Sequence, residues 1–201
     1  MFYIIKNDIT EEIKIRRSLF IASLRRTDNI EAAKDFISEI SKIHKNATHN
    51  CWGYIVGEKG ETAHFSDAGE PAGTAGKPIF NTLRKHELTN IAAVVTRYYG
   101  GVKLGIRGLI DAYSQVVENA IGSATIQALI KSYQYQLSVG YDQFEQLKYN
   151  LTKMNAVILD AKFTANVSLK ISAEEYAHAE VFSYLCELQK KGAIKFRASD
   201  S

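Results

Sequence analysis

The segment FSDAGEPAGTAGKPIF, residues 65–80, constrains the fold most strongly, because it contains both prolines and three of the 13 glycines of the chain. Proline removes a backbone donor and glycine adds backbone freedom, so this segment is neither an ordinary strand nor the middle of a helix. A phosphate-binding P-loop needs glycine five residues before Gly76 and Ser or Thr after Lys77. Those two positions hold Pro71 and Pro78. We therefore predict a structured loop of another kind that leads into a helix.

This loop carries acidic side chains before a run of small residues. The backbone N–H groups from Gly73 through Lys77 could point at an anion from a helix start. Asp67 and Glu70 could instead bind a cation, accept hydrogen bonds from a partner, or cap the loop's own amides. The structural alternatives are a rigid, self-capped surface loop and a scaffold in which Asp67 or Glu70 forms an ion pair with Arg97. We prefer a functional interpretation, because loops held on a scaffold often carry function. The acidic loop of the candidate site comprises Asp67, Glu70, Gly73, Thr74 and Gly76.

A second glycine-rich segment, TRYYGGVKLGIRG, spans residues 96–108 and follows an apolar strand. Basic and aromatic side chains between glycines at a helix start favour a phosphate or nucleic-acid contact. Alternation along the strand implies that either Tyr98 or Tyr99 faces the core. The GxGxxG spacing is absent, and a tight turn with solvated Lys and Arg is the structural alternative. The proposed binding residues are Lys77, Arg97, Tyr98, Gly100, Gly101, Lys103, Gly105 and Arg107.

Apolar periodicity predicts alternating strands and helices in the first 128 residues. We expect Asp28 to cap a helix whose apolar face runs from Ile30 to Ile43. NCWGYIVG and ETAHFS are typical of a β-hairpin, and NIAAVVTRYY of a buried strand. FYIIK and IKIRRSLFIASL predict further strands, and two more helices are expected at about residues 78–86 and 109–121.

The pattern begins again after Gln127, which predicts a second domain. It reads as a strand, a helix capped by Asp142, two strands around a turn near 163–166, a helix capped by Ser172, and a last strand AIKFRA. This βαββαβ order is that of a ferredoxin-like unit. We therefore predict an α+β protein with domains at residues 1–128 and 132–201.

Composition sets limits on the class of protein. The chain has 201 residues, 46% hydrophobic and 23% charged, with a net charge of +3, so any basic site must be local. Its two cysteines form no CxxC pair, which argues against a disulfide framework or a structural zinc site. The start MFYIIKND lacks the pattern of a signal peptide, and no apolar stretch approaches the ~20 residues of a membrane helix. We expect a soluble, cytoplasmic protein.

Cys–His chemistry is a further possibility on the predicted hairpin. His49 and Cys51 alternate onto one face of a strand, and His64 lies on the other arm. Strand cysteines are more often inert buried residues, and the spacing matches no metal-ligand pattern. We therefore assign no catalytic residue, metal or cofactor.

Together, the blocks SDAGEPAGTAGKP and VVTRYYGGVKLG resemble the YigZ/IMPACT protein family over residues 18–124, and the part from Ser132 resembles the small C-terminal domain of its bacterial members. The resemblance implies an N-terminal domain like the second domain of ribosomal protein S-five, in which a mixed sheet packs against two helices. It also implies a ferredoxin-like C-terminal domain similar to one of elongation factor G. In its eukaryotic branch the family regulates translation by competing for an activator of a stress-responsive initiation-factor kinase. For bacterial members it suggests nucleic-acid or ribosome association.

Three hypotheses follow for function. The preferred one is a translation-associated binding or regulatory protein, expected to be monomeric, that contacts RNA, the ribosome or a translation factor through the two glycine-rich loops. The second is an enzyme acting on a phosphorylated or nucleotide-like small molecule between these loops, with Asp67 and Glu70 as base or metal ligand. The third is a protein-interaction regulator that touches no nucleic acid.

Overall fold

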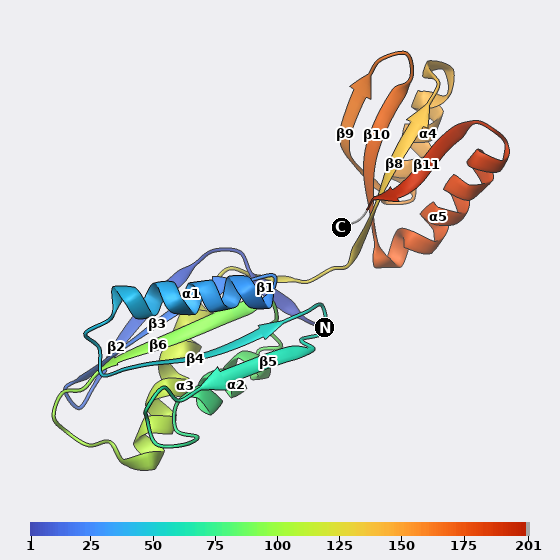
Figure 1. Ribbon diagram of the computed structural model, residues 1–201. Helices are drawn as coiled ribbons and strands as arrows, with labels where there is room; N and C mark the ends of the chain where they lie inside the picture. The colour runs from blue at the N-terminus through green and yellow to red at the C-terminus, as the bar shows by residue number, and fades with distance from the viewer. Residues whose placement is uncertain (200–201) are drawn as a thin grey trace. The chain divides into compact units, whose positions relative to one another are not determined.

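In the computed structural model, which describes residues 1–199, the chain divides into two units, Met1–Leu129 and the residues from Ile130 onward (Figure 1). Each unit has its own sheet and its own hydrophobic core. An α/β unit followed by a βαββαβ unit confirms the predicted α+β class.

The strand predicted to be buried, β6 (Ile91–Tyr98), lies at the centre of the first sheet. Seven of its eight residues are buried, which explains its apolar sequence. The five strands occur in the order β2 (Ile9–Ile15), β3 (Ser18–Arg26), β6, β4 (His49–Val56) and β5 (Thr62–Ser66). All four pairings are antiparallel, so the mixed sheet implied by the family resemblance is wrong for this chain. The predicted β4–β5 hairpin is confirmed.

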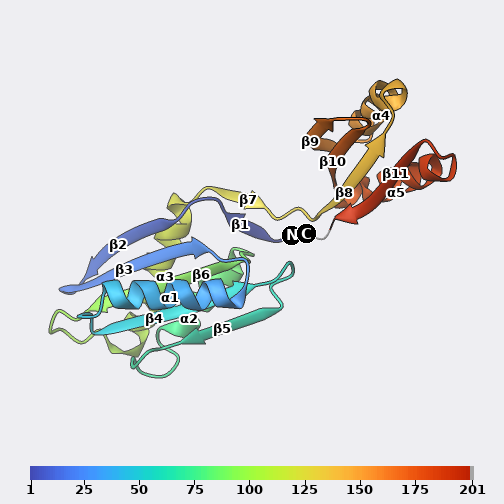
Figure 2. The same cartoon turned by 45° about the horizontal axis from the view of Figure 1, so that its top comes forward.

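Helices cover both faces of this sheet (Figure 2). One core lies between the sheet and the helices α2 (Gly76–Lys85) and α3 (Gly105–Ser123). A smaller core lies under α1 (Ile30–Ile43) on the opposite face. The apolar face predicted for α1 is confirmed at Ala33, Phe36 and Ile40, whereas its two ends, Ile30 and Ile43, are exposed. The helix α3 begins four residues before the predicted start at residue 109. Away from this sheet, β1 (Tyr3–Ile5) pairs with β7 (Ile126–Ala128).

The second unit is a four-stranded antiparallel sheet with two helices. Its elements follow in the order β8 (Ser132–Val139), α4 (Tyr141–Lys153), β9 (Val157–Phe163), β10 (Val167–Glu174), α5 (Glu175–Lys190) and β11 (Ile194–Ser199). The strand order β11-β8-β10-β9 agrees with the predicted ferredoxin-like connection. Within the described residues, no helix is long and apolar enough to cross a membrane.

The predicted helix caps are wrong by one or two residues. The carboxamide of Asn29, not the carboxylate of Asp28, accepts the N–H of Ala32 at the start of α1. The helix α4 begins before Asp142 and has no side-chain cap. Ser172 is still paired within β10, so α5 begins only after the strand ends.

Candidate nucleic-acid interface

The two glycine-rich segments form loops at one end of the five-stranded sheet. β6 ends at Tyr98, and its antiparallel neighbours β3 and β4 begin at this end, at Ser18 and His49. β5 also ends here, so loop 67–75 after β5 lies beside loop 99–104 after β6. The tight turn between β2 and β3, at Arg16 and Arg17, reaches the same end. The fold therefore brings three turns together, although they are far apart in the sequence.

Asp67 holds loop 67–75 from within. Its carboxylate accepts the backbone N–H groups of Gly73, Ala75 and Gly76 at 2.8, 2.9 and 2.8 Å. Partial burial works to raise the pKa of Asp67, but these three donors outweigh it and hold the pKa below its usual value. Three of the amides that the sequence offered to an external anion are thus bonded to a carboxylate of the protein itself. The loop has the self-capped form, which was the structural alternative.

Glu70 forms a buried ion pair with Arg97. An Nη of Arg97 donates to Oε1 of Glu70 at 2.6 Å, and the two side chains are only 6% and 3% exposed. The Tyr113 hydroxyl of α3 donates to the same oxygen at 2.9 Å. The pair therefore links loop 67–75, strand β6 and helix α3.

Alternation along β6 explains the burial of Arg97. Val95 and Arg97 point to the face that α2 and α3 cover, so the guanidinium enters the core. It lies over the rings of Phe20 and Tyr99, at 5.3 and 5.2 Å from their centroids. The expectation that Arg97 contacts phosphate is corrected here, because Arg97 is 5% exposed and paired with a carboxylate.

Close backbone approach explains two of the glycines. A Cβ on Gly76 would lie 2.6 Å from the backbone of Ser66, and a Cβ on Gly100 would lie 2.0 Å from the carbonyl oxygen of Arg17. The N–H of Gly100 also donates to the hydroxyl of Ser18 at 3.2 Å. Gly100 therefore allows loop 99–104 to pack against the start of β3.

We expect Gly100→Ala to destabilise the first unit by about 1–3 kcal/mol, because the new methyl group meets backbone atoms that cannot turn aside. The single tryptophan, Trp52 in β4, reports unfolding of this unit in urea. The control is Gly122→Ala in α3, where a Cβ meets nothing within 4 Å. That change is expected to stabilise by about 0.5–1 kcal/mol through helix propensity. Equal midpoints for the two variants would contradict the packing role.

The Cys51 thiol is a buried hydrogen-bond donor. It donates to the carbonyl oxygen of Asp67 at 2.8 Å, and burial raises its pKa to about 12. His49 lies on the same side, with Nδ1 3.0 Å from the carbonyl oxygen of Ala68. His64 instead lies near Tyr54, which packs under α1 on the opposite face. The three side chains therefore form neither a reactive thiolate site nor a ligand set.

The remaining predicted residues divide into engaged and exposed groups. Thr74 is buried, and its hydroxyl donates to the carbonyl oxygen of Pro71 at 2.7 Å. Tyr98 is half-buried with its hydroxyl 3.0 Å from Nδ1 of His44, whereas Tyr99 is 43% exposed. Of the two rings, Tyr99 is therefore the more accessible to a base, and a contact by Tyr98 stays a prediction. Three glycines have positive φ at partly or fully exposed positions: Gly73, Gly101 and Gly105.

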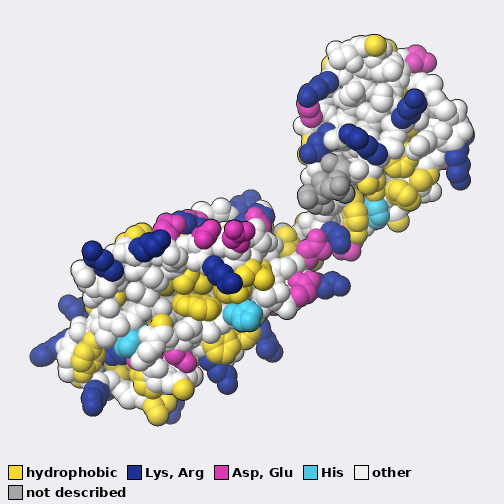
Figure 3. All heavy atoms as spheres, in the orientation of Figure 1, with side chains coloured by type: hydrophobic (Ala, Val, Ile, Leu, Met, Phe, Trp, Pro, Cys, Tyr) yellow, Lys and Arg dark blue, Asp and Glu magenta, His cyan; other side chains and the backbone are white. Residues whose placement is uncertain are grey.

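The exposed side chains at this end of the sheet are mainly basic. Figure 3 shows Lys and Arg side chains gathered where Figure 1 places the loop after β6 and the turn between β2 and β3. Arg107 forms a loose ion pair with Asp111 one helical turn later, at 4.0 Å, and its side chain is 96% exposed. We call this surface the loop face; its exposed members are Arg16, Arg17, Lys77, Tyr99, Lys103 and Arg107. Sequence reasoning missed Arg16 and Arg17, which only the strand pairing places beside the glycine-rich loops.

The architecture defines a class of two-unit α+β proteins, and comparison with known proteins identifies the family. The Impact N-terminal domain matches residues 16–121, and a domain of unknown function, DUF1949, matches residues 137–185. The chain belongs to the IMPACT family.

Relatives of similar length support this assignment. An IMPACT family member of Haemophilus influenzae is 36% identical over 190 residues, which cover 94% of this chain and 91% of the relative. The IMPACT family member YigZ of Escherichia coli is 35% identical over 192 residues, covering 94% and 93%. A solved structure described as that of an hypothetical protein is 33% identical, with a TM-score of 0.68, and the match covers 100% of this chain and 98% of that one.

Proposed function

We propose that the protein regulates translation in the cytoplasm by contacting RNA on the ribosome through its loop face. The observation that carries this proposal is the exposure of five cations and Tyr99 at one end of the sheet, on loops and helix starts that buried bonds hold in place. Cations supply most of the affinity for a phosphate backbone, and an exposed aromatic ring adds a stacking surface. The translational role that the family resemblance implies supports the same choice.

The geometry favours a binding surface over an active site. In the enzyme hypothesis, Asp67 and Glu70 act as base or metal ligand. Asp67 accepts three backbone N–H groups, and Glu70 is paired with Arg97 and Tyr113, so both carboxylates serve the fold. The described residues hold no cluster of three or more His, Cys, Asp or Glu side chains arranged for a metal. The exposed cations have no buried partner of this kind: the ion pair of Arg107 with Asp111 is long and fully solvated, which leaves the guanidinium available for an external phosphate.

Ribosome co-sedimentation tests the proposal. We expect the wild-type chain to pellet with ribosomes at low salt and Lys103→Gln/Arg107→Gln to bind roughly tenfold or more weakly, since two phosphate contacts are lost. The matched control removes two exposed lysines of the same unit, in Lys34→Gln/Lys59→Gln, away from the loop face. Equal pelleting of the two variants, or no pelleting of the wild-type chain at low salt, would contradict the proposal.

A further inference from the structure

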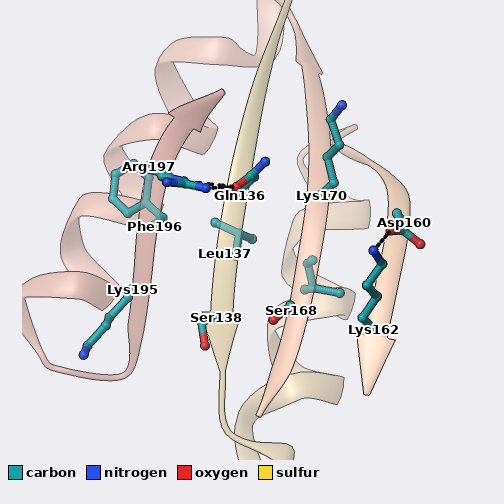
Figure 4. Close-up of a pocket in the computed structure, with 11 residues that line it drawn as sticks. Gln136, Leu137, Ser138, Asp160, Lys162, Ser168, Lys170, Lys195, Phe196 and Arg197 are labelled. Atoms are coloured by element: carbon teal, nitrogen blue, oxygen red, sulfur yellow. Dashed lines mark hydrogen bonds and ion pairs between the residues drawn. The ribbon is translucent and has the colours of Figure 1, made fainter. Parts of the chain in front are cut away.

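Within residues 130–199, the sheet of the second unit has one face that no helix covers. The apolar residues of its strands pack with α4 and α5 in a single core. On the other face, a shallow hollow of about 570 Å³ is lined by polar side chains from all four strands (Figure 4). We call this surface the open face. The loop face belongs to the first unit, so the two surfaces are separate features of the chain.

Strand register aligns the polar side chains of the open face in rows across the sheet. Lys195 pairs with Ser138, Ser138 with Ser168, and Ser168 with Lys162. This row therefore runs lysine, serine, serine, lysine from one edge strand to the other. With strands about 4.8 Å apart, the lysine backbones at its ends are roughly 14 Å apart.

A second row lies two residues further along the strands, roughly 6.8 Å from the first. It runs Arg197, Gln136, Lys170 and Asp160. Arg197 donates to the carboxamide oxygen of Gln136 at 3.0 and 2.6 Å. Asp160 lies 4.0 Å from Lys162 of the first row (Figure 4). It is the single acid in the hollow and only partly offsets the cations.

Positive charge is concentrated on this face. Four cations and one carboxylate line the hollow, a formal charge of +3. The other charged residues between 129 and 199 are five basic and six acidic, a formal charge of −1. A solvated antiparallel face ordinarily mixes both signs, and like charges close together oppose each other. The distribution therefore fits an external polyanion that lies across the strands.

The chemistry of the rows points to a sugar–phosphate backbone rather than to bases. Phe196 contributes to the hollow, but its ring packs edge-on against Tyr135 and Phe182 in the core. Among the described residues that line the hollow, none therefore offers an aromatic ring for base stacking. Lys and Arg contact phosphates, and the Ser and Gln side chains between them can exchange hydrogen bonds with phosphate and with the 2′-hydroxyl of ribose.

We propose that the open face binds RNA through its backbone, without sequence preference. The four cations hold phosphates, and Ser138, Ser168 and Gln136 between them hold sugar hydroxyls. This surface is additional to the loop face and does not depend on it. A chain with both surfaces contacts RNA from each of its two units.

Fluorescence anisotropy with the full chain and a labelled oligouridylate of about 20 nucleotides tests this proposal. The variant Lys170→Gln/Lys195→Gln removes two cations of the hollow that form no ion pair with the described residues. We expect its affinity to fall about 25-fold near 0.1 M salt and its log–log salt slope to fall by about 1.4, the share of two phosphates on a single strand. The matched control, Lys153→Gln/Lys190→Gln, removes two exposed lysines from α4 and α5 and is expected to bind like the wild type.

The outcomes separate this proposal from the one for the loop face. Equal affinity of Lys170→Gln/Lys195→Gln and its control would overturn the open-face site, whatever Lys103→Gln/Arg107→Gln does. If the wild-type chain binds oligouridylate but does not pellet with ribosomes, and Lys170→Gln/Lys195→Gln weakens the oligouridylate binding, the result would support the open face and contradict the loop face. An oligothymidylate of the same length is expected to bind several-fold more weakly, because it lacks the 2′-hydroxyl. Equal binding of the two strands would overturn the choice of RNA.

Discussion

Replacing Arg97 by methionine is expected to lower the free energy of unfolding of the first unit by about 3–5 kcal/mol, the usual cost of removing one partner of a buried ion pair. The change leaves the Glu70 carboxylate in the core with the Tyr113 hydroxyl as its remaining hydrogen-bond partner. It also removes the guanidinium from between Phe20 and Tyr99. Urea unfolding near neutral pH, followed by the fluorescence of Trp52, measures the loss.

Two further variants make this prediction specific to the buried pair. Arg25→Met breaks ion pairs with Asp8 and Glu39, but there the partners are about half exposed, so a cost of about 0–1 kcal/mol is expected. In Glu70→Gln/Arg97→Met both charges are removed, and the double variant is expected to lose less than the sum of its single changes. If Arg97→Met lowers the free energy of unfolding by no more than Arg25→Met does, the ion pair between Glu70 and Arg97 does not hold the loops together.

The sequence predicted that the two glycine-rich loops would lie together, but it misassigned the role of Arg97. The proximity of the two loops followed from the order of the two motifs and from the resemblance to a known family. The direction of Arg97 follows from alternation with Val95, and this was available from the sequence. A cation beside two tyrosines and two glycines resembles a binding residue, however, so phosphate contact was preferred over the alternative of an ion pair with Asp67 or Glu70. Nothing local to Arg97 selects Glu70, 27 residues earlier, as its partner.

The sequence left the role of Asp67 open between cation binding, partner binding and capping of its own loop. It could not select capping, because the amides that Asp67 accepts lie six to nine residues later in the chain. Short caps such as the Asn29 side chain on Ala32 follow a fixed local spacing, whereas the path of a long loop depends on what packs beneath it. Here the backbone of Ser66 lies so close to Gly76 that a Cβ would meet it at 2.6 Å, and this contact sets the path. The predicted start of α5 was wrong for a related reason. Pairing with β8 keeps Ser172 within strand β10, and such pairing between distant segments cannot be read from the local sequence.

The open face could not be recognised from the sequence. Its cations lie on β9, β10 and β11, in segments that each look like an ordinary strand with a polar outward side. Only the strand order and register place Lys162 and Lys195 at opposite ends of one row. Charge counted along the chain averages this surface with the acidic residues elsewhere in the unit, which is why the small net charge gave no indication of it.

Replacing Asp67 by alanine is expected to destabilise the first unit by about 2–4 kcal/mol at neutral pH. Three backbone N–H groups lose a charged acceptor, and each such hydrogen bond is worth about 1.5–3 kcal/mol. The total is smaller than the sum, because Asp67 is half-buried and water replaces part of what is lost. Asp35→Ala is the matched control, since Asp35 is an exposed carboxylate on α1 and is expected to change stability by no more than about 0.5 kcal/mol.

The dependence on pH distinguishes the charge of Asp67 from its shape. Because the folded pKa of Asp67 is lowered, its stabilisation is fully present above the unfolded value of roughly 4 and is lost as pH falls through the folded value. The difference in unfolding free energy between wild type and Asp67→Ala should therefore be largest near pH 7 and shrink toward pH 2, in the same Trp52 urea assay. A difference that does not change over this range would show that the side chain only fills space. A difference that shrinks would establish that loop 67–75 carries its own anion, the Asp67 carboxylate, on the amides of Gly73, Ala75 and Gly76.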